Sequence, residues 1–480
     1  MTAEPGIKSA PATRVATVGG LSELRLRAHF YRDPIACLDR GFKRYGRAIE
    51  LRGFRRNGTP SGLALLGPNF NREVLTHDRL RPTGVWPVVA PEGTAQNNIR
   101  SIFLRMSGSE HARIATPIHQ HLSRSRIDSY FNRIRQIAVS EIEAWPVGGV
   151  ADIHHLAQRL VQRNSFTLLF GEERLEEIRR LGDLIATYHN ANWSHGAQWP
   201  RWNVKGLPYH TVLGYAEQLE QEVMRWYEEA ARRPAEGNLR TVFKQIAETD
   251  GCRISEQRIA AHLAGVMLAS LETTAVTLTW SLFLLTQHPH LMAELTDELS
   301  ALPPIRDIDQ DTLFAQPLLD GVIKETLRLI TPVPVLGFKT QERCEIAGRE
   351  LGENTPVMIS PHLTHRMPEI YEAPDRFRPH RWRTLEPRLF EFLPFSAGSH
   401  RCPGYWFAMQ GLKVALAVIL PRFRVNVVPG ARIDRGYAAI TLPGRGMPMQ
   451  ILPQDREFRL APCGGTVFDL FTREERPCMN

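Results

Sequence analysis

FSAGSHRCPG, residues 395–404, is the stretch of this chain with the most specific chemistry. Gly398 and Gly404 flank Cys402, and glycine lets a backbone turn sharply and approach a ligand closely. Pro403 suits the first position of a helix, because its missing N–H would be unpaired there. Cys402 would then lie at a helix N-terminus, which favours thiolate over thiol. The pattern predicts a metal ligand or a nucleophile, with a buried free cysteine as the structural alternative.

The same loop resembles the heme-binding loop of the cytochrome P450 family, Phe-x-x-Gly-x-His-x-Cys-x-Gly. The matching residues are Phe395, Gly398, His400, Cys402 and Gly404. The resemblance implies heme b as the cofactor, the Cys402 thiolate as the axial iron ligand, and the other four residues as part of the cofactor-binding loop. It also implies that His400 contacts a heme propionate.

Two segments upstream of this loop match the family in the right order. Glu325-Thr-Leu-Arg328 resembles its Glu-x-x-Arg helix, and Arg381, within Phe377–Trp382, resembles the arginine of the segment that follows. An i, i+3 Glu–Arg pair alone is usually a solvated helix face. As a buried triad, the three side chains would lock the proline-rich region beneath the heme through bidentate hydrogen bonds. We expect this role to be structural rather than catalytic.

A long apolar helix is predicted between Ser255 and His288, where Gly265 is the one glycine and no proline occurs before Pro289. Ser255 is a suitable N-cap. About 33 residues would give a helix roughly 50 Å long, apolar on nearly every face. Such a helix either crosses a large domain or spans a membrane. The polar residues within it, Glu272 among them, favour a buried core helix.

The middle of this helix carries a further family match. Ala269-Ser270-Leu-Glu272-Thr273-Thr resembles the acid–alcohol pair on the helix that crosses the distal face of the heme. Several threonines on one helix are by default a packing pattern, but a carboxylate in an apolar helix centre is costly unless it is paired or functional. The resemblance implies that Thr273 and Glu272 relay protons to dioxygen and that Ala269 contacts the cofactor.

His111, in Glu110-His-Ala-Arg113, resembles the other propionate-binding segment of the family. The chain also departs from the family pattern. Ser270 replaces a common glycine, Ala115 and Phe338 stand where arginines often bind propionates, and the neighbouring Lys339 is a candidate substitute. His380 and Gly411 replace common glutamates. These departures put individual propionate contacts in question and leave Cys402 and the triad unchanged.

Composition and length exclude several classes of protein. The 480 residues are 43% hydrophobic and 23% charged, as in ordinary globular proteins. Lys and Arg number 59 against 51 Asp and Glu, a net charge of +8, which permits an acidic partner without requiring nucleic acid. The six cysteines are scattered, so neither a zinc ribbon nor a disulfide scaffold is expected. The N-terminus lacks a signal-peptide pattern, and we expect a cytoplasmic protein without a transmembrane segment.

The predicted fold is mainly α with a small β-rich region, a single large triangular heme-thiolate monooxygenase fold with the long helix over the heme. We expect a flexible arm over residues 1–30, the catalytic domain over residues 31–453 and a tail of unknown role over residues 454–480. Short strands are predicted at 48–51 and 63–66, with a hairpin turn at 55–58 between them. A monomer is expected.

The resemblance implies a monooxygenase that inserts one oxygen atom from O2 into a lipophilic small molecule, with two electrons from a separate partner. Only 27 residues follow residue 453, so we expect an acidic ferredoxin or flavodoxin with its reductase as donor, and no binding to nucleic acid. A basic docking face is one hypothesis for the arginines that precede the cysteine loop, and internal pairing is the other. These are Arg376, Arg378, Arg381, Arg383, Arg388 and Arg401.

By the family pattern the substrate pocket is lined by residues 85–89, 266–277, 333–336 and 437–440, which are mostly aliphatic and indicate a lipophilic substrate without obligatory charge recognition. Trp193, Trp199 and Trp202 form either a lid or ordinary packing. Two alternative functions remain: a heme-thiolate isomerase, dehydratase or oxidative-coupling enzyme, and a non-enzymatic heme-based gas sensor. Retention of Glu272 and Thr273 argues against the first alternative.

Overall fold

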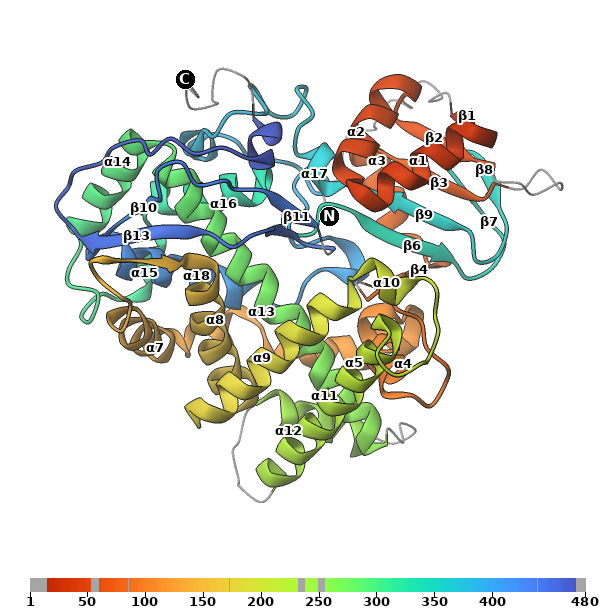
Figure 1. Ribbon diagram of the computed structural model, residues 1–480, viewed down its shortest axis with the longest axis horizontal. Helices are drawn as coiled ribbons and strands as arrows, with labels where there is room; N and C mark the ends of the chain where they lie inside the picture. The colour runs from red at the N-terminus through yellow and green to blue at the C-terminus, as the bar shows by residue number, and fades with distance from the viewer. Residues whose placement is uncertain are drawn as a thin grey trace, which may run out of the picture.

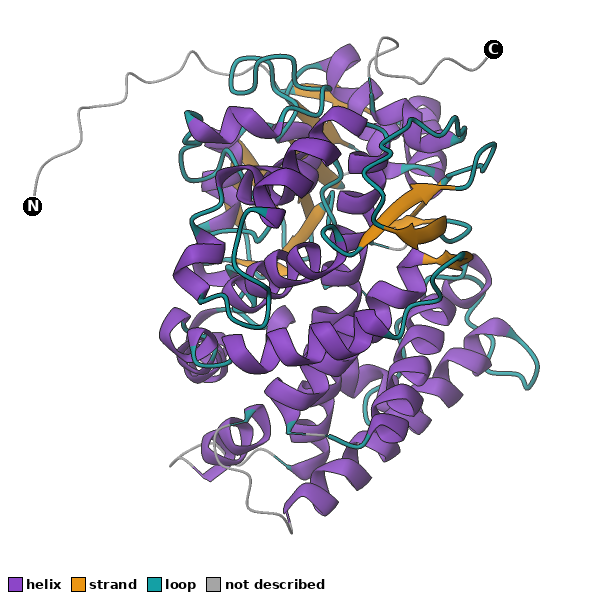
Figure 2. Cartoon of the chain, turned by 90° about the vertical axis from the view of Figure 1, so that its left-hand side faces the viewer, coloured by secondary structure: helices purple, strands orange, loops and turns teal. Residues whose placement is uncertain are grey.

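The computed structural model describes residues 15–52, 60–84, 86–171, 173–231, 238–248, 255–437 and 439–471. Helices make up most of this part of the chain, and the strands are confined to one large and three small sheets (Figures 1 and 2). The long helix α13 (Glu256–Thr286) runs through the middle of the molecule (Figure 1). The prediction of a mainly α fold with a β-rich flank around a long central helix is therefore confirmed.

α13 is the core of the helical region. Ser255 caps it, because its Oγ accepts a hydrogen bond from the backbone N–H of Arg258 at 3.3 Å. The helix packs against α8 (Ile153–Phe170), α11 (Pro208–Ala231), α16 (Pro317–Leu329) and α18 (Tyr405–Ile419). Within the described residues it is the one helix long and apolar enough to cross a membrane, and 67% of its most apolar window is buried inside the protein. Its apolar character is thus accounted for by burial in the core.

The large sheet has six strands in the order β1 (Ala16–Val18), β2 (Ala48–Leu51), β3 (Gly62–Leu65), β9 (Pro356–Ile359), β6 (Leu336–Thr340) and β4 (Leu80–Pro82). β2 and β3 pair antiparallel, as the strand predictions at 48–51 and 63–66 require. The turn expected between them lies at 55–58, outside the described residues.

The two faces of this sheet have different neighbours. α1 (Gly20–Arg32) and α2 (Pro34–Tyr45) pack on one face, where Ile49 and Ala64 are buried. α3 (Pro68–Leu75) and the segment that leads into Cys402 pack on the other, where Phe338 joins Leu393 and Ala397 in one apolar cluster. The cysteine loop is therefore held against one specific face of the sheet.

Regular structure occurs within the ranges assigned to the arm and the tail. β1 and most of α1 lie within residues 1–30, because β1 finds hydrogen-bond partners along the parallel strand β2. In the tail, the short helix η4 (Thr466–Leu470) buries Val467 in the main core. β10 (Phe423–Val427), β13 (Pro448–Pro453) and β5 (Gly149–Asp152) form a second sheet that joins distant parts of the chain.

Candidate active site

The loop at 395–404 folds back on itself around Cys402. The backbone N–H of Cys402 donates to the carbonyl of Phe395 at 2.8 Å, which closes the loop. Helix α18 begins at Tyr405, two residues later than predicted, because Pro403 and Gly404 form the turn that caps it. Burial raises the pKa of the Cys402 thiol, and the Gly404 N–H and the Arg401 charge act in the opposite direction without overcoming it. The Gly404 N–H thus acts in the direction expected of a helix terminus, and burial acts against it.

The two glycines of the loop are under different steric constraints. Gly398 has a φ of +68°, and a Cβ there would collide with the backbone carbonyl of Leu75 at the end of α3. Gly404 has an ordinary φ of −80°, and a Cβ there would lie 3.7 Å from Cys402 Sγ. Gly398 is thus required by the packing of η3 (Gly398–His400) on α3, whereas Gly404 is not required by backbone geometry.

A stripe of partly accessible residues interrupts the burial of α13 at its centre. Residues 259–265 and 275–286 are buried, and between them Glu272 and Thr274 are partly accessible on other faces. Val266, Ala269, Ser270 and Thr273 are also partly accessible. Their spacing of three and four places them on one helical face. A face that remains accessible in the middle of a core helix borders an internal space, and the Thr273 hydroxyl lies on it, donating to the Ala269 carbonyl at 3.1 Å.

Glu272 points away from this stripe and toward α8. Its Oε1 lies 2.8 Å from His154 Nε2, and its Oε2 accepts a hydrogen bond from Gln158 Nε2 at 2.9 Å. His154 Nδ1 in turn lies 3.2 Å from the Thr279 hydroxyl. Burial acts to raise the pKa of Glu272, but His154, Gln158 and the His189 charge hold it below its ordinary value. The carboxylate is therefore stabilised in its charged form.

The structure brings together the two histidines expected at the propionates. The rings of His111, on α5 (Gly108–His121), and His400 have centroids 4.3 Å apart. Burial lowers the pKa of both imidazoles, that of His400 to about 4. Burial thus disfavours the charged form of both imidazoles. Ala115 is buried on the same helix, and Phe338 is buried in the sheet cluster, so neither replaces the missing arginine.

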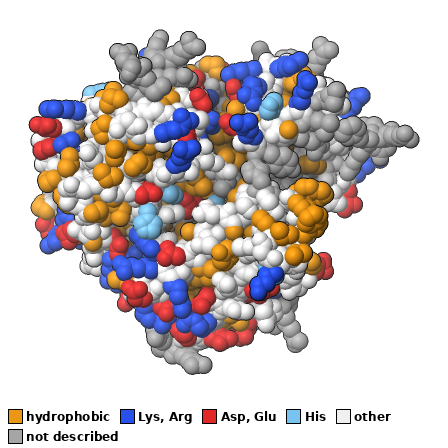
Figure 3. Space-filling view, viewed as in Figure 1, with side chains coloured by type: hydrophobic (Ala, Val, Ile, Leu, Met, Phe, Trp, Pro, Cys, Tyr) orange, Lys and Arg blue, Asp and Glu red, His pale blue; other side chains and the backbone are white. Residues whose placement is uncertain are grey.

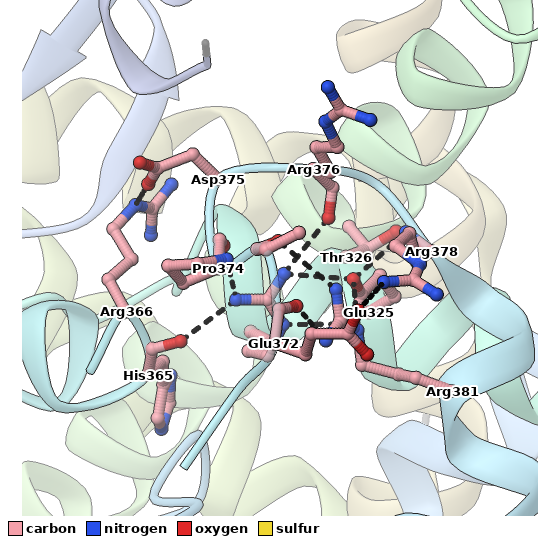
Figure 4. Close-up of polar contacts among 12 residues, drawn as sticks. Glu325, Thr326, His365, Arg366, Glu372, Pro374, Asp375, Arg376, Arg378 and Arg381 are labelled. Carbon is pink, nitrogen blue, oxygen red and sulfur yellow. Dashed lines mark hydrogen bonds and ion pairs between the residues drawn. The ribbon is translucent and has the colours of Figure 1, made fainter. Parts of the chain in front are cut away.

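Glu325, Arg328 and Arg381 form the predicted triad. Figure 4 labels Glu325 and Arg381 among the polar contacts of this region. Arg328 donates to both carboxylate oxygens of Glu325 at 2.8 and 2.9 Å, and Arg381 Nε donates at 3.0 Å. Glu325 and Arg328 have no exposed side-chain surface. Arg328 also donates to the carbonyls of His365, Pro374 and Arg376. These bonds tie α16 to the segment 365–381 and match the expected structural arrangement.

Sequence reasoning missed three residues of these networks. Trp382 Nε1 donates to Glu325 Oε2 at 2.9 Å and supplies another bond to the buried carboxylate. The position of Trp382 directly after Arg381 was the feature of the sequence that could have identified it. His154 and Gln158 lie on one face of α8, four residues apart, but no feature of the sequence points from them to Glu272 more than a hundred positions later.

The residues expected to line the substrate pocket or to form a lid over it differ in burial. Trp86 and Val88 are buried, and Val85 and Ala438 lie outside the described residues. Trp193 packs edge-to-face against Tyr437, with ring centroids 6.3 Å apart. Trp199 and Trp202 are 81% and 63% exposed, so ordinary packing does not account for them. Figure 3 shows apolar side chains gathered on this side of the molecule, over the segment between α10 (His195–Gln198) and α11.

These residues fit a heme group. A thiol suited to a soft metal lies in a closed loop, the two imidazoles can donate hydrogen bonds to carboxylates, and the accessible stripe of α13 supplies a wall of small side chains. Within the described residues, no cluster of three or more His, Cys, Asp or Glu side chains could hold a metal ion in another way.

Comparison with known proteins agrees with this arrangement. A family model described as Cytochrome P450 matches residues 63–443. The chain is 27% identical over 404 residues to cyclooctatin synthase of Streptomyces melanosporofaciens, covering 81% of this chain and 85% of that protein. It is 26% identical over 391 residues to pentalenene oxygenase of Streptomyces avermitilis, covering 79% of this chain and 85% of that protein.

A solved structure, retinoic acid bound cyanobacterial CYP120A1, superposes with a TM-score of 0.77 at 20% identity and covers 93% of this chain and all of that one. At this level of identity the superposition supports the fold. Because the family model spans most of the chain, the protein belongs to the cytochrome P450 family of heme-thiolate monooxygenases and is an oxidoreductase whose cofactor is heme b.

Proposed function

We propose that this protein hydroxylates, or oxidises in a related way, a lipophilic small molecule, with two electrons drawn from a separate acidic ferredoxin or flavodoxin and its reductase. The observation that carries the proposal is the placement of Thr273 on the accessible stripe of α13, next to a Glu272 that is held as a carboxylate by α8. A hydroxyl on the cavity wall beside a charged carboxylate is suited to delivering protons.

Bound heme supplies the activation of dioxygen, for which a thiolate ligand is suited. The protein contributes a proton path and a pocket. His154 and Glu272 are each 13% exposed, so this pair can exchange protons with solvent and still face the core. We propose that protons pass from His154 to Glu272 and reach the Thr273 hydroxyl through water, because the two side chains face different sides of α13. Cys402 holds the cofactor, with Phe395, Gly398, Gly404 and Ala269 around it, and His111 and His400 bind propionates.

The electron donor is proposed to dock beside the start of α18. Three of the arginines first considered are paired internally: Arg381 with Glu325 at 3.0 Å, Arg378 with Glu372 at 3.3 Å and Arg383 with Glu294 at 3.8 Å. Arg388 and Arg401 are exposed, and the Arg401 guanidinium lies over the ring of Tyr405 at 5.7 Å. We therefore assign the docking face to Arg388 and Arg401, in a cytoplasmic protein that acts as a monomer.

One spectrum tests the ligand on which this function depends. The reduced protein under carbon monoxide should give a strongly red-shifted Soret band that is lost in Cys402→Ala. Substrate-dependent transfer of a single atom from isotopically labelled dioxygen into product then separates a monooxygenase from an isomerase, dehydratase or coupling enzyme. Folded, heme-loaded protein without the red shift would overturn the assignment.

A further inference from the structure

Four cations gather at the free edge of the large sheet, and we call them the cationic cluster. They are Arg81 on β4, Lys339 on β6, Arg100 at the end of α4 (Ala95–Arg100) and Arg105 in the short helix η1 (Phe103–Arg105). Arg81 and Lys339 are directly opposite each other in the antiparallel register of β4 and β6. Like charges in this position repel unless an anion lies between them.

The cationic cluster has no acidic partner in the part of the chain that the structure describes. The side chains of its arginines donate hydrogen bonds to uncharged acceptors: Asn354 Oδ1, the Trp86 carbonyl and the Arg100 carbonyl. Arg79, two residues before Arg81, instead forms an ion pair with Glu342 at 2.8 Å. The absence of an acidic partner is thus specific to the cationic cluster, since Arg79 at the same edge of the sheet has one.

The cluster members act on one another. Burial, followed by the charges of Arg81, Arg105 and Arg100, lowers the pKa of Lys339. Burial and the neighbouring cations, including Arg201 in the segment before α11, lower the pKa of Arg100 to about 10. These shifts indicate that the four cations lie close enough to repel one another, with Arg81 and Lys339 exposed to solvent.

Unused hydrogen-bond donors lie in the same region. Arg105 Nε is buried without a partner among the described residues, and its side chain packs on Gly84, where a Cβ would lie 2.5 Å from Arg105 Cδ. Trp86 is 2% exposed and its Nε1–H is likewise unpartnered in that part of the chain, while its carbonyl accepts from Arg100. Donors without acceptors indicate a ligand that brings oxygen atoms.

The sheet separates this cluster from the cysteine loop. Successive residues of a strand face opposite sides, and Phe338 faces the side where Leu393 and Ala397 lead into Cys402. Lys339 and Arg81 therefore lie on the other side. A heme propionate is the less suitable occupant for that reason, and a carboxylate on a separate molecule is the more suitable one.

The surroundings indicate what else that molecule carries. The segment between α9 (Leu175–Asn192) and α11 contributes Arg201 and exposes Trp199 and Trp202. No acidic residue occurs between Asp183 and Glu217. Cations beside exposed aromatic surface suit an amphipathic anion. We propose that the cationic cluster binds the carboxylate of an amphipathic substrate whose apolar body passes the free edge of the sheet formed by β4 and so reaches the site of oxidation. This proposal rests on the proposed function and replaces the expectation of a substrate without charge recognition.

Binding of paired ligands to the heme-loaded protein tests the proposal. Straight-chain acids from octanoate to hexadecanoate and the matching alcohols are titrated by calorimetry, which requires no turnover. At the best chain length the acid should bind about tenfold tighter than the alcohol or more, as charge-assisted hydrogen bonds provide, and added salt should reduce this preference. Arg105→Gln combined with Lys339→Gln should abolish the preference, and Arg79→Gln, the matched control, should retain it.

Equal binding of acid and alcohol, no binding of any acid, or an unchanged preference in the double variant would overturn the proposal. A second arm tests the other source of a carboxylate: the heme-free protein is titrated with heme and with heme dimethyl ester, followed by tryptophan fluorescence. Weaker binding of heme alone in the double variant, without loss of acid preference, would assign the cluster to a propionate and overturn the substrate assignment. The carbon monoxide spectrum reports separately whether the proposed function has failed.

Discussion

The Glu272 carboxylate lies 2.8 Å from Nε2 of His154, and this contact joins the middle of the core helix α13 to the start of α8. Glu272 and Thr273 are neighbours in sequence but face different sides of α13, because successive residues of an α-helix are rotated by about 100°. The carboxylate is thus directed toward α8 and the hydroxyl toward the internal space. In the proposed proton path, His154 lies between solvent and the Glu272 carboxylate.

Loss of the imidazole should slow proton delivery. His154→Ala should lower product formed per electron consumed several-fold, and Glu272→Gln should lower it about tenfold or more, as loss of general acid catalysis does. Both variants should show an increased solvent isotope effect on turnover, which a purely structural role would not produce. His155→Gln, at the exposed adjacent position, is the control. Unchanged coupling and isotope effect in His154→Ala would remove His154 from the path.

The same pair predicts a pH dependence of stability. The pKa of Glu272 is lower in the folded protein than its ordinary value, so its contribution to stability is fully present above about pH 5 and is lost as the pH falls through the lowered pKa. The difference in the free energy of unfolding between the native protein and Glu272→Gln should therefore be constant above that pH and shrink below it. Urea titrations at a series of pH values measure it, and a difference that grows on acidification would contradict the sign.

Breaking the buried triad should destabilise the protein strongly. Arg328→Leu leaves the fully buried Glu325 without two of its hydrogen bonds and should cost about 3–5 kcal/mol in the free energy of unfolding. Trp382→Phe removes one bond and should cost about 1–2 kcal/mol. Arg383→Gln, with its side chain 51% exposed, is the control and should change stability by less than about 0.5 kcal/mol. Similar urea midpoints for Arg328→Leu and the control would show that the network is not structural.

The two glycines of the cysteine loop should respond differently to alanine. Gly398→Ala introduces a side chain at positive φ and against the Leu75 carbonyl, and should cost about 2 kcal/mol or more with a lower heme content. Gly404→Ala meets only an ordinary contact and should retain its heme. Pyridine hemochrome assay of the two purified variants measures heme content. Equal heme content in both would show that the packing on α3 does not position the loop.

Two helical glycines provide a similar contrast in the core. Gly411 borders a cavity of about 20 Å³ that is also lined by Asn164 and Thr274, and a Cβ there meets no atom within 4 Å. Gly411→Ala should stabilise the protein by about 1 kcal/mol, since alanine favours the helix and fills space. Gly265→Ala would collide with Ile102 and should destabilise by about 1–3 kcal/mol. The midpoint temperature of thermal unfolding should therefore rise in Gly411→Ala and fall in Gly265→Ala.

Much of this site could be predicted from local patterns. The spacing around Cys402, the pair at Glu325 and Arg328, and the uninterrupted run that became α13 are properties of contiguous residues. Such patterns depend on helix periodicity and on turn geometry, which neighbouring residues largely determine. The cofactor and the family were implied by the resemblance of these patterns to a known family, and not by periodicity or turn geometry alone.

The partners of these residues were decided only by tertiary structure. His154 meets Glu272, and Lys339 faces Arg81, across more than a hundred and more than two hundred positions of sequence. Periodicity predicts which residues share a face, but not which element that face meets. The pKa of the Cys402 thiol depends on tertiary structure in the same way, because burial by distant segments raises it while the local Gly404 N–H lowers it. Charge and hydrogen bonding act over a few ångströms of space, so they depend on the packing that brings remote residues together.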